Sequence, residues 1–93
     1  MNTQDFEAQL IDENFGEIVT VEKPVGYAMG VHQHPFEAWA LITKGALTLQ
    51  VAGVSTTYAA GDIFRLPAGM PHSESAISDG ATYLAGRKHQ AAA

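Results

Sequence analysis

The sequence contains no cysteine among its 93 residues. Disulfide bridges, thiolate metal sites and cysteine nucleophiles are therefore excluded, and any metal would have to be held by histidine and carboxylate side chains. Basic residues are also few, with five Lys and Arg against ten Asp and Glu, for a formal net charge of −5. Since these basic residues form no cluster, the sequence predicts no nucleic-acid binding.

Long hydrophobic runs are absent as well. The longest apolar run, Ala38–Ile42, is far shorter than the roughly 20 residues of a membrane helix. The first residues lack the positive and apolar regions of a signal peptide, so we expect no membrane association and a cytoplasmic location. The length fits one domain, residues 1–93, and a homodimer would let so small a chain bury more apolar surface.

The remaining pattern predicts a mostly β structure. A short helix is expected over the first dozen residues, with Thr3 as its N-cap and with Phe6 and Leu10 on one face, plugging one end of the fold. From Gly16 onward, short alternating segments are separated by Gly-containing turns, including a predicted turn at Lys44-Gly45. About eight such strands indicate an all-β sandwich or small barrel. The expected strands cover residues 16–23, 27–34, 37–43, 46–51, 54–59, 63–66, 72–77 and 81–87.

Three histidines suggest a site. His32 and His34 are two residues apart, so on a strand they project to the same side and can converge on one ion if the strand curves. His72 follows a sharp turn in which Pro67 fixes the backbone and Gly69 allows a positive φ, and a neighbouring strand could bring it to the pair. The alternative is a metal-free, hydrogen-bonded cluster of the three histidines.

The two segments that carry these histidines resemble the two motifs of the cupin superfamily. The first family motif, G-x5-H-x-H-x3,4-E-x6-G, is matched over residues 26–45 by Gly26, His32, His34 and Gly45. The second, G-x5-P-x-G-x2-H-x3-N, is matched over residues 61–76 by Gly61, Pro67, Gly69 and His72. The resemblance implies a small jelly-roll barrel of two facing antiparallel sheets, often dimeric, with a metal held by His32, His34 and His72.

Two positions of the family motifs differ in this chain. Ala38 stands at the glutamate position of the first motif, and Ala76 stands at the asparagine position of the second. Glu37 is one residue early and has the wrong parity to join the histidines, unless a β-bulge turns it inward. Three neutral imidazoles would leave a divalent ion its full charge of +2, and they favour Fe, Zn, Ni or Cu over Mg or Ca.

Other side chains have less specific interpretations. We expect Trp39 to pack between the sheets or in a dimer interface, and Arg65 to pair with an acid or bind a substrate carboxylate. Tyr83 is a core residue or a hydroxyl donor to a ligand, and His89 is expected to face solvent.

Two functions remain open. The first is a metal-dependent enzyme acting on a small oxygen-bearing substrate, as a dioxygenase or isomerase would, with its catalytic residues unassigned. The second is a non-catalytic module that binds or senses a small molecule. The fold alone does not decide between them, because it hosts many unrelated functions.

Overall fold

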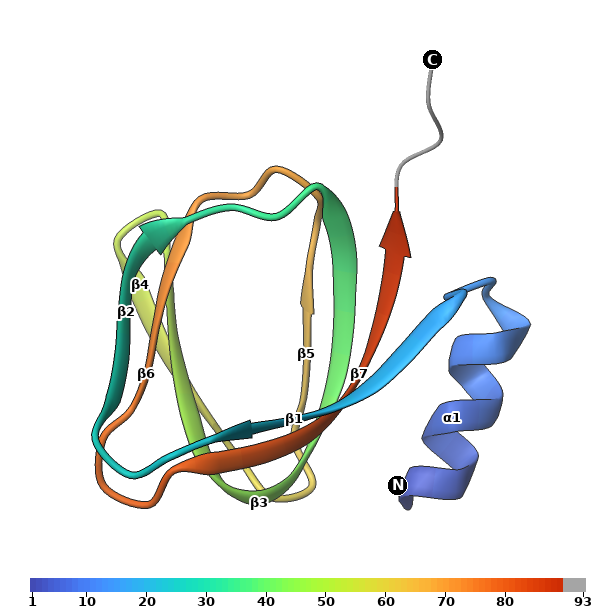
Figure 1. Ribbon diagram of the computed structural model, residues 1–93, viewed down its shortest axis with the longest axis horizontal. Coiled ribbons are helices and arrows are strands. Elements are labelled where there is room, and N and C mark those ends of the chain that lie inside the picture. The colour runs from blue at the N-terminus through green and yellow to red at the C-terminus, as the bar shows by residue number, and fades with distance from the viewer. Residues whose placement is uncertain (90–93) are drawn as a thin grey trace.

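The computed structural model describes residues 1–89. The sequence predicts a frayed end at Ala91–Ala93, and this prediction lies outside the described residues. One helix precedes seven antiparallel strands that wrap around an interior (Figure 1). The elements are α1 (Thr3–Asp12), β1 (Glu17–Lys23), β2 (Tyr27–His32), β3 (Phe36–Val51), β4 (Val54–Ala59), β5 (Ile63–Leu66), β6 (His72–Ala76) and β7 (Ala81–His89). The predicted all-β fold with a short N-terminal helix is confirmed.

Strand β3 joins the two halves of the barrel. Its first part pairs with β7 and β5, and its second part pairs with β6 and β4. The register with β7 shifts between Ile42 and Lys44, where the strand bends. The predicted turn at Lys44-Gly45 is therefore wrong: the chain bends there without reversing, so seven strands replace the eight expected.

Gly45 makes this bend possible. Its φ is +74°, which a residue with a side chain adopts only at a cost. A Cβ at this position would collide with the carbonyl oxygen of Gly80, which accepts a hydrogen bond from the Ala46 N–H at 3.0 Å. Glycine at position 45 therefore allows β3 to continue through the bend and to lie close to the β6–β7 connection.

The hydrophobic residues form two clusters on opposite faces of the sheet that contains β1, β7, β3 and β5. The inner cluster lies between the two halves and contains Ala40, Ile42, Leu47, Leu49, Phe64, Leu66, Ala76, Ala81, Tyr83 and Ala85. The outer cluster is built on Phe6, Leu10, Phe15 and Leu41. Phe6 and Leu10 lie on one buried face of the helix, as predicted, and Phe15 is buried in the same cluster.

The helix does not plug an end of the fold, contrary to the sequence-based expectation. It packs on the outer face of the sheet beside β3 and β7 (Figure 1). Gly86 leaves space for it, because a Cβ there would lie 2.5 Å from Leu10 Cδ2. The N-cap is Asn2 and not Thr3: the Asn2 side chain accepts a hydrogen bond from the Asp5 N–H at 2.8 Å. The helix thereby leaves the interior to the strands and to the side chains described next.

Within residues 1–89, no helix is both long enough and apolar enough to cross a membrane.

Candidate metal centre

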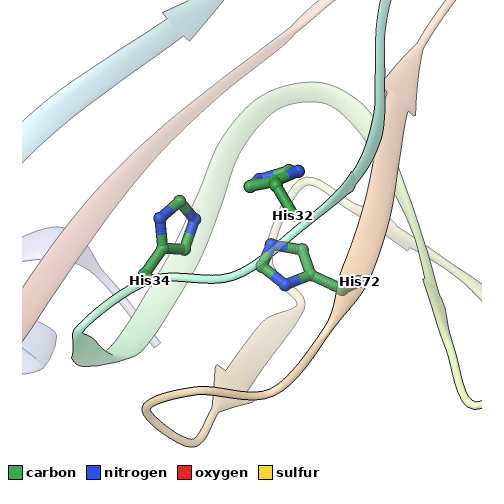
Figure 2. Close-up of side chains that lie close together, drawn as sticks. All are labelled: His32, His34 and His72. Atoms are coloured by element: carbon green, nitrogen blue, oxygen red, sulfur yellow. The ribbon is translucent and has the colours of Figure 1, made fainter.

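Three histidines meet at one end of the barrel interior (Figure 2). Strands β2 and β6 pair so that His32 lies opposite His72, and His34 follows two residues after the end of β2. The ring centroids are 4.4 Å apart for His32 and His72, 4.9 Å for His32 and His34, and 5.1 Å for His34 and His72. The predicted convergence of the three side chains is confirmed.

The connections before β3 and before β6 are tied together. The Gly69 N–H donates a hydrogen bond to the His34 carbonyl oxygen at 2.8 Å. Gly69 has a φ of +75°, as the sequence predicts for this corner. His34 lies in the β2–β3 connection instead of in the strand predicted to end there, so this bond helps to hold its backbone beside the segment that leads to His72.

Two of the rings have a defined orientation. His32 Nδ1 lies 2.7 Å from the Gly30 carbonyl oxygen, and His72 Nδ1 lies 2.9 Å from the Met70 carbonyl oxygen. A carbonyl oxygen can only accept, so each Nδ1 carries the proton and donates it. Each Nε2 of a neutral ring then keeps a free lone pair, which is the form of histidine that binds metal ions.

These two Nε2 atoms are buried and have no hydrogen-bond partner among residues 1–89. A metal-free cluster held by hydrogen bonds among the rings therefore does not describe His32 and His72. An unpartnered buried polar atom costs about 1–3 kcal/mol, so its presence calls for a ligand that satisfies it. A metal ion bound to both lone pairs would do so.

His34 completes the group from the β2–β3 connection. Its ring stacks on Phe36, with centroids 4.7 Å apart and planes 14° from parallel. Burial, followed by the nearby His72 and His32, lowers the pKa of His34 below its ordinary value of 6.5. The ring is thus neutral at pH 7 and offers a lone pair as well.

The ligand atoms have the right spacing for one ion. One nitrogen from each ring can be chosen so that all three lie within 4.8 Å of one another. Metal–nitrogen bonds of about 2.0–2.1 Å put nitrogens on a shared ion roughly 3–4 Å apart, so small side-chain rotations would close the site. The three histidines are therefore positioned to hold a metal ion, and three imidazoles suit Zn, Ni, Cu or Fe.

A carboxylate that sequence reasoning missed lies beside the histidines. Glu74 follows His72 by two residues on β6, and its Oε2 is 3.8 Å from His72 Nε2. Its Oε1 accepts a hydrogen bond from the Tyr27 hydroxyl at 2.5 Å. Burial and Glu74 raise the pKa of Tyr27, so the phenol keeps its proton and acts as the donor. The i, i+2 spacing from His72 is the sequence signal that identifies Glu74, because alternate residues of a strand point to the same side.

A cavity of about 80 Å³ opens beside the histidines. His34, His72 and Glu74 line one part of it, together with apolar side chains such as Phe36 and Ala38. Lys23, Tyr83 and Arg87 add polar groups. Burial, followed by the charge of Glu74, raises the pKa of Tyr83, so its hydroxyl stays neutral and can donate to a bound molecule.

Glu37 and Arg65 lie outside this site. Glu37 Oε2 accepts a hydrogen bond from Arg65 Nε at 2.7 Å, and Arg65 also contacts Glu13 at 3.4 Å. No bulge turns Glu37 toward the histidines, since its neighbours Ala38 and Trp39 keep regular pairing with β5 and β7. Arg65 is paired with acids, as one of its two predicted roles requires.

Trp39 and His89 also lie on the outside. Trp39 packs under the helix, with its ring centroid 5.3 Å from Phe6 and 5.6 Å from Phe15, so the predicted position between the sheets is wrong. His89 is exposed, as expected. Its Nε2 is 3.9 Å from Glu17 Oε2.

Comparison with known proteins agrees with this geometry. Residues 19–85 match the Cupin_2 family of cupin domains. This stretch contains both motifs and all three histidines, and it is most of the chain. The protein therefore belongs to the cupin family.

Solved structures with the same fold include proteins of several kinds. A conserved protein of unknown function from Streptococcus pyogenes, SPY1581, is 26% identical, with a TM-score of 0.66 over 80% of this chain and 65% of that one. KdgF from Halomonas sp. is 20% identical, with a TM-score of 0.68 over 80% of this chain and 68% of that one. The DMSP lyase DddQ from Ruegeria pomeroyi is 23% identical, with a TM-score of 0.71 over 82% of this chain and 39% of that one.

The chain thus spans about two thirds of the first two proteins and less than half of the third. Among curated proteins, none matches this chain.

Proposed function

We propose that this protein is a metal-dependent enzyme that acts on a small oxygen-bearing substrate inside the barrel. One observation carries the proposal: two buried Nε2 atoms, of His32 and His72, have no hydrogen-bond partner in the described part of the chain and lie beside His34. Backbone carbonyls fix both rings so that these lone pairs are free. A site with this form is suited to a divalent transition metal, namely Fe, Zn, Ni or Cu.

The metal would supply the chemistry that the side chains lack. A bound ion polarises a substrate oxygen as a Lewis acid, or provides redox chemistry if it is iron. Three protein nitrogens leave coordination positions free for a substrate. This chemistry covers both reaction classes considered from the sequence, a dioxygenase and an isomerase.

The side chains around the cavity would select and orient the substrate. Phe36 and Ala38 give the wall an apolar surface that excludes water from the reacting atoms. The Arg87 guanidinium lies 5.0 Å from the Phe36 ring centroid and bonds Glu17 at 3.1 Å, so it is held where it can bind a carboxylate or carbonyl oxygen. The volume of about 80 Å³ is well below the roughly 300 Å³ of typical drug-sized pockets, which favours a substrate of few atoms.

A non-catalytic binding or sensing module is the second candidate. Position 38 supports it, because alanine stands where the first cupin motif has a glutamate, and that carboxylate is then unavailable as a base. In this case the metal and the cavity would bind a small molecule without turning it over.

Metal analysis of the purified protein tests the site. We expect close to one equivalent of a transition metal in the wild type, and a large loss in His34→Ala. His89→Ala is the matched control, since His89 is an exposed histidine away from the cluster. Equal metal content in wild type and His34→Ala would refute the site.

Substrate screening then separates enzyme from binding module. Oxygen uptake by the Fe(II)-loaded protein, measured with diketones, thiols and catechols, is expected for a dioxygenase. Isomerisation of small hydroxy or keto acids by the Zn- or Ni-loaded protein is expected for an isomerase. Ligand-dependent thermal shifts without turnover would instead favour the binding module.

A homodimer and a cytoplasmic location belong to the proposal as well. Val25, Val31 and Ile77 are 67%, 77% and 62% exposed, and a second copy could cover them. The Gly26 N–H donates to the Ile77 carbonyl oxygen at 2.9 Å, so Val25 and Ile77 belong to neighbouring turns. Light scattering should give twice the mass of the 9.9 kDa chain, and a monomer at micromolar concentration would contradict it.

A further inference from the structure

Glu74 occupies an unusual place for a charged residue. Its side chain is only 9% exposed and lies in the barrel interior, where it lines the same cavity as His34 and His72. Buried carboxylates are rare in proteins unless a cation or hydrogen bonds compensate them. Among the described residues, the Glu74 side chain accepts one hydrogen bond, from Tyr27, and this bond satisfies Oε1 alone.

The second oxygen is directed to the histidines. Glu74 Oε2 lies 3.8 Å from His72 Nε2, which is one of the two buried nitrogens without a partner. An ordinary ion pair would require a proton on His72 Nε2 in addition to the one that Nδ1 donates to the Met70 carbonyl. A divalent cation between the two atoms satisfies both of them without that extra proton. The separation of 3.8 Å fits two ligands of one ion.

Tyr27 defines how the carboxylate is held. Its hydroxyl binds Oε1, so the carboxylate can turn Oε2 toward the ion while keeping one fixed contact. Ligating carboxylates are commonly hydrogen-bonded in this manner by an outer shell of residues. Strand β2 carries both Tyr27 and His32, and β6 carries both Glu74 and His72, so two paired strands supply all four groups.

Because of this arrangement, we propose that Glu74 is the carboxylate ligand of the metal centre, in place of the glutamate that the first cupin motif would have at position 38. The inference rests on the proposed metal site. It alters the chemistry of that site, because a carboxylate reduces the net charge of a divalent ion and its neutral ligands from +2 to +1. The ion would then be a weaker Lewis acid than one bound to three imidazoles alone.

A crystal structure of the wild-type protein loaded with Zn(II) tests the ligation directly. We expect Glu74 Oε2 at about 2.0–2.2 Å from the ion, together with the three histidine nitrogens. An ion bound by the histidines with Glu74 still only on Tyr27 would overturn this inference and leave the proposed function intact. An ion bound elsewhere would overturn both.

Zinc affinity, measured by competition with a chromophoric chelator, gives an independent readout. Glu74→Gln keeps the shape of the side chain and should weaken zinc binding by about 10–100-fold. Tyr27→Phe should weaken zinc binding less. Glu37→Gln is the matched control, because Glu37 pairs with Arg65 on the outer face. Unchanged affinity in a folded Glu74→Gln protein would refute the ligand role. If that variant does not fold, the wild-type crystal structure decides.

Discussion

Replacing His72 by leucine should separate the stability of this protein from its ability to bind metal. His72 is 2% exposed, and its Nε2 has no hydrogen-bond partner within residues 1–89. A histidine that serves as a metal ligand should stabilise the folded protein only when the metal is bound. A histidine with a structural role should stabilise the folded protein with or without metal.

The magnitudes follow from the contacts of His72. Removing the unpartnered Nε2 relieves about 1–3 kcal/mol, and losing the Nδ1 hydrogen bond to the Met70 carbonyl costs about 0.5–1.5 kcal/mol. Leucine has a similar volume, and the cavity that His72 lines is also lined by the apolar side chains of Leu66 and Phe64. We therefore expect metal-free His72→Leu to be as stable as metal-free wild type, or more stable by about 1 kcal/mol.

Metal binding should reverse this order and make wild type more stable than His72→Leu. At a free concentration of 100 times Kd, a ligand stabilises the folded state by about 2.7 kcal/mol. In a domain of about 90 residues this raises Tm by roughly 10–20 °C. His72→Leu lacks one of three nitrogens and should shift much less. Thermal unfolding followed by circular dichroism, first with a chelator and then with Zn(II) or Ni(II), measures the Tm of wild type and of His72→Leu without and with metal.

Two outcomes would refute the reasoning. One is a metal-free His72→Leu protein destabilised by more than about 3 kcal/mol, which would make the histidine a structural residue. The other is an equal rise of Tm with metal in wild type and variant. His89→Leu controls for metal binding at exposed histidines.

Two further predictions concern the bend in β3 and the titration of the site. Gly45→Ala should lower the free energy of unfolding by at least about 2 kcal/mol, from a positive φ and a collision with the Gly80 carbonyl, as measured by urea denaturation. Gly53→Ala has a similar φ of +79° but free space around it, so it should cost only about 1 kcal/mol, and equal losses would contradict the packing argument. In the metal-free protein, the lowered pKa of His34 means that the unfolded chain takes up its proton first as the pH falls. The free energy of unfolding should therefore not depend on the titration of His34 above about pH 6.5, and it should decrease as the pH drops below this value. His34→Gln should show a smaller decrease over pH 5–6.5 than wild type.

The strands and the histidine cluster were largely predictable because their signals are local. Alternation of apolar residues marks β1 and the second part of β3, and Gly and Pro mark the corner before His72. The two-residue spacing of His32 and His34 brings their rings close together, although His34 lies past the end of β2. The sequence allowed the strand of His72 to lie beside that of His32, and the pairing of β2 with β6 places the two residues opposite each other.

The bend in β3 was missed because the sequence pattern is ambiguous there. Lys44-Gly45 is a typical turn signal, and a positive φ at Gly45 fits both a reversal and a bend. Only the strand pairing distinguishes the two: the part of β3 before the bend pairs with β7 and the part after it pairs with β4, so the chain bends without reversing. The position of Trp39 was missed for a related reason: strand parity gives a side chain's face but not what covers that face.

Glu74 was missed because the family motif directs attention to position 38. In the fold, positions 38 and 74 belong to different strands, yet both line the cavity beside His34 and His72. Alanine at 38 leaves the wall of β3 without a carboxylate, and Glu74 brings one from β6, where Tyr27 holds it. The carboxylate that is missing at position 38 and the one that is present at position 74 therefore compensate each other in the net charge of the site. A double variant, Ala38→Glu with Glu74→Ala, should therefore keep metal affinity closer to wild type than Glu74→Ala alone. No gain from the added glutamate would show that the carboxylate at 74 has a role that position 38 cannot fill.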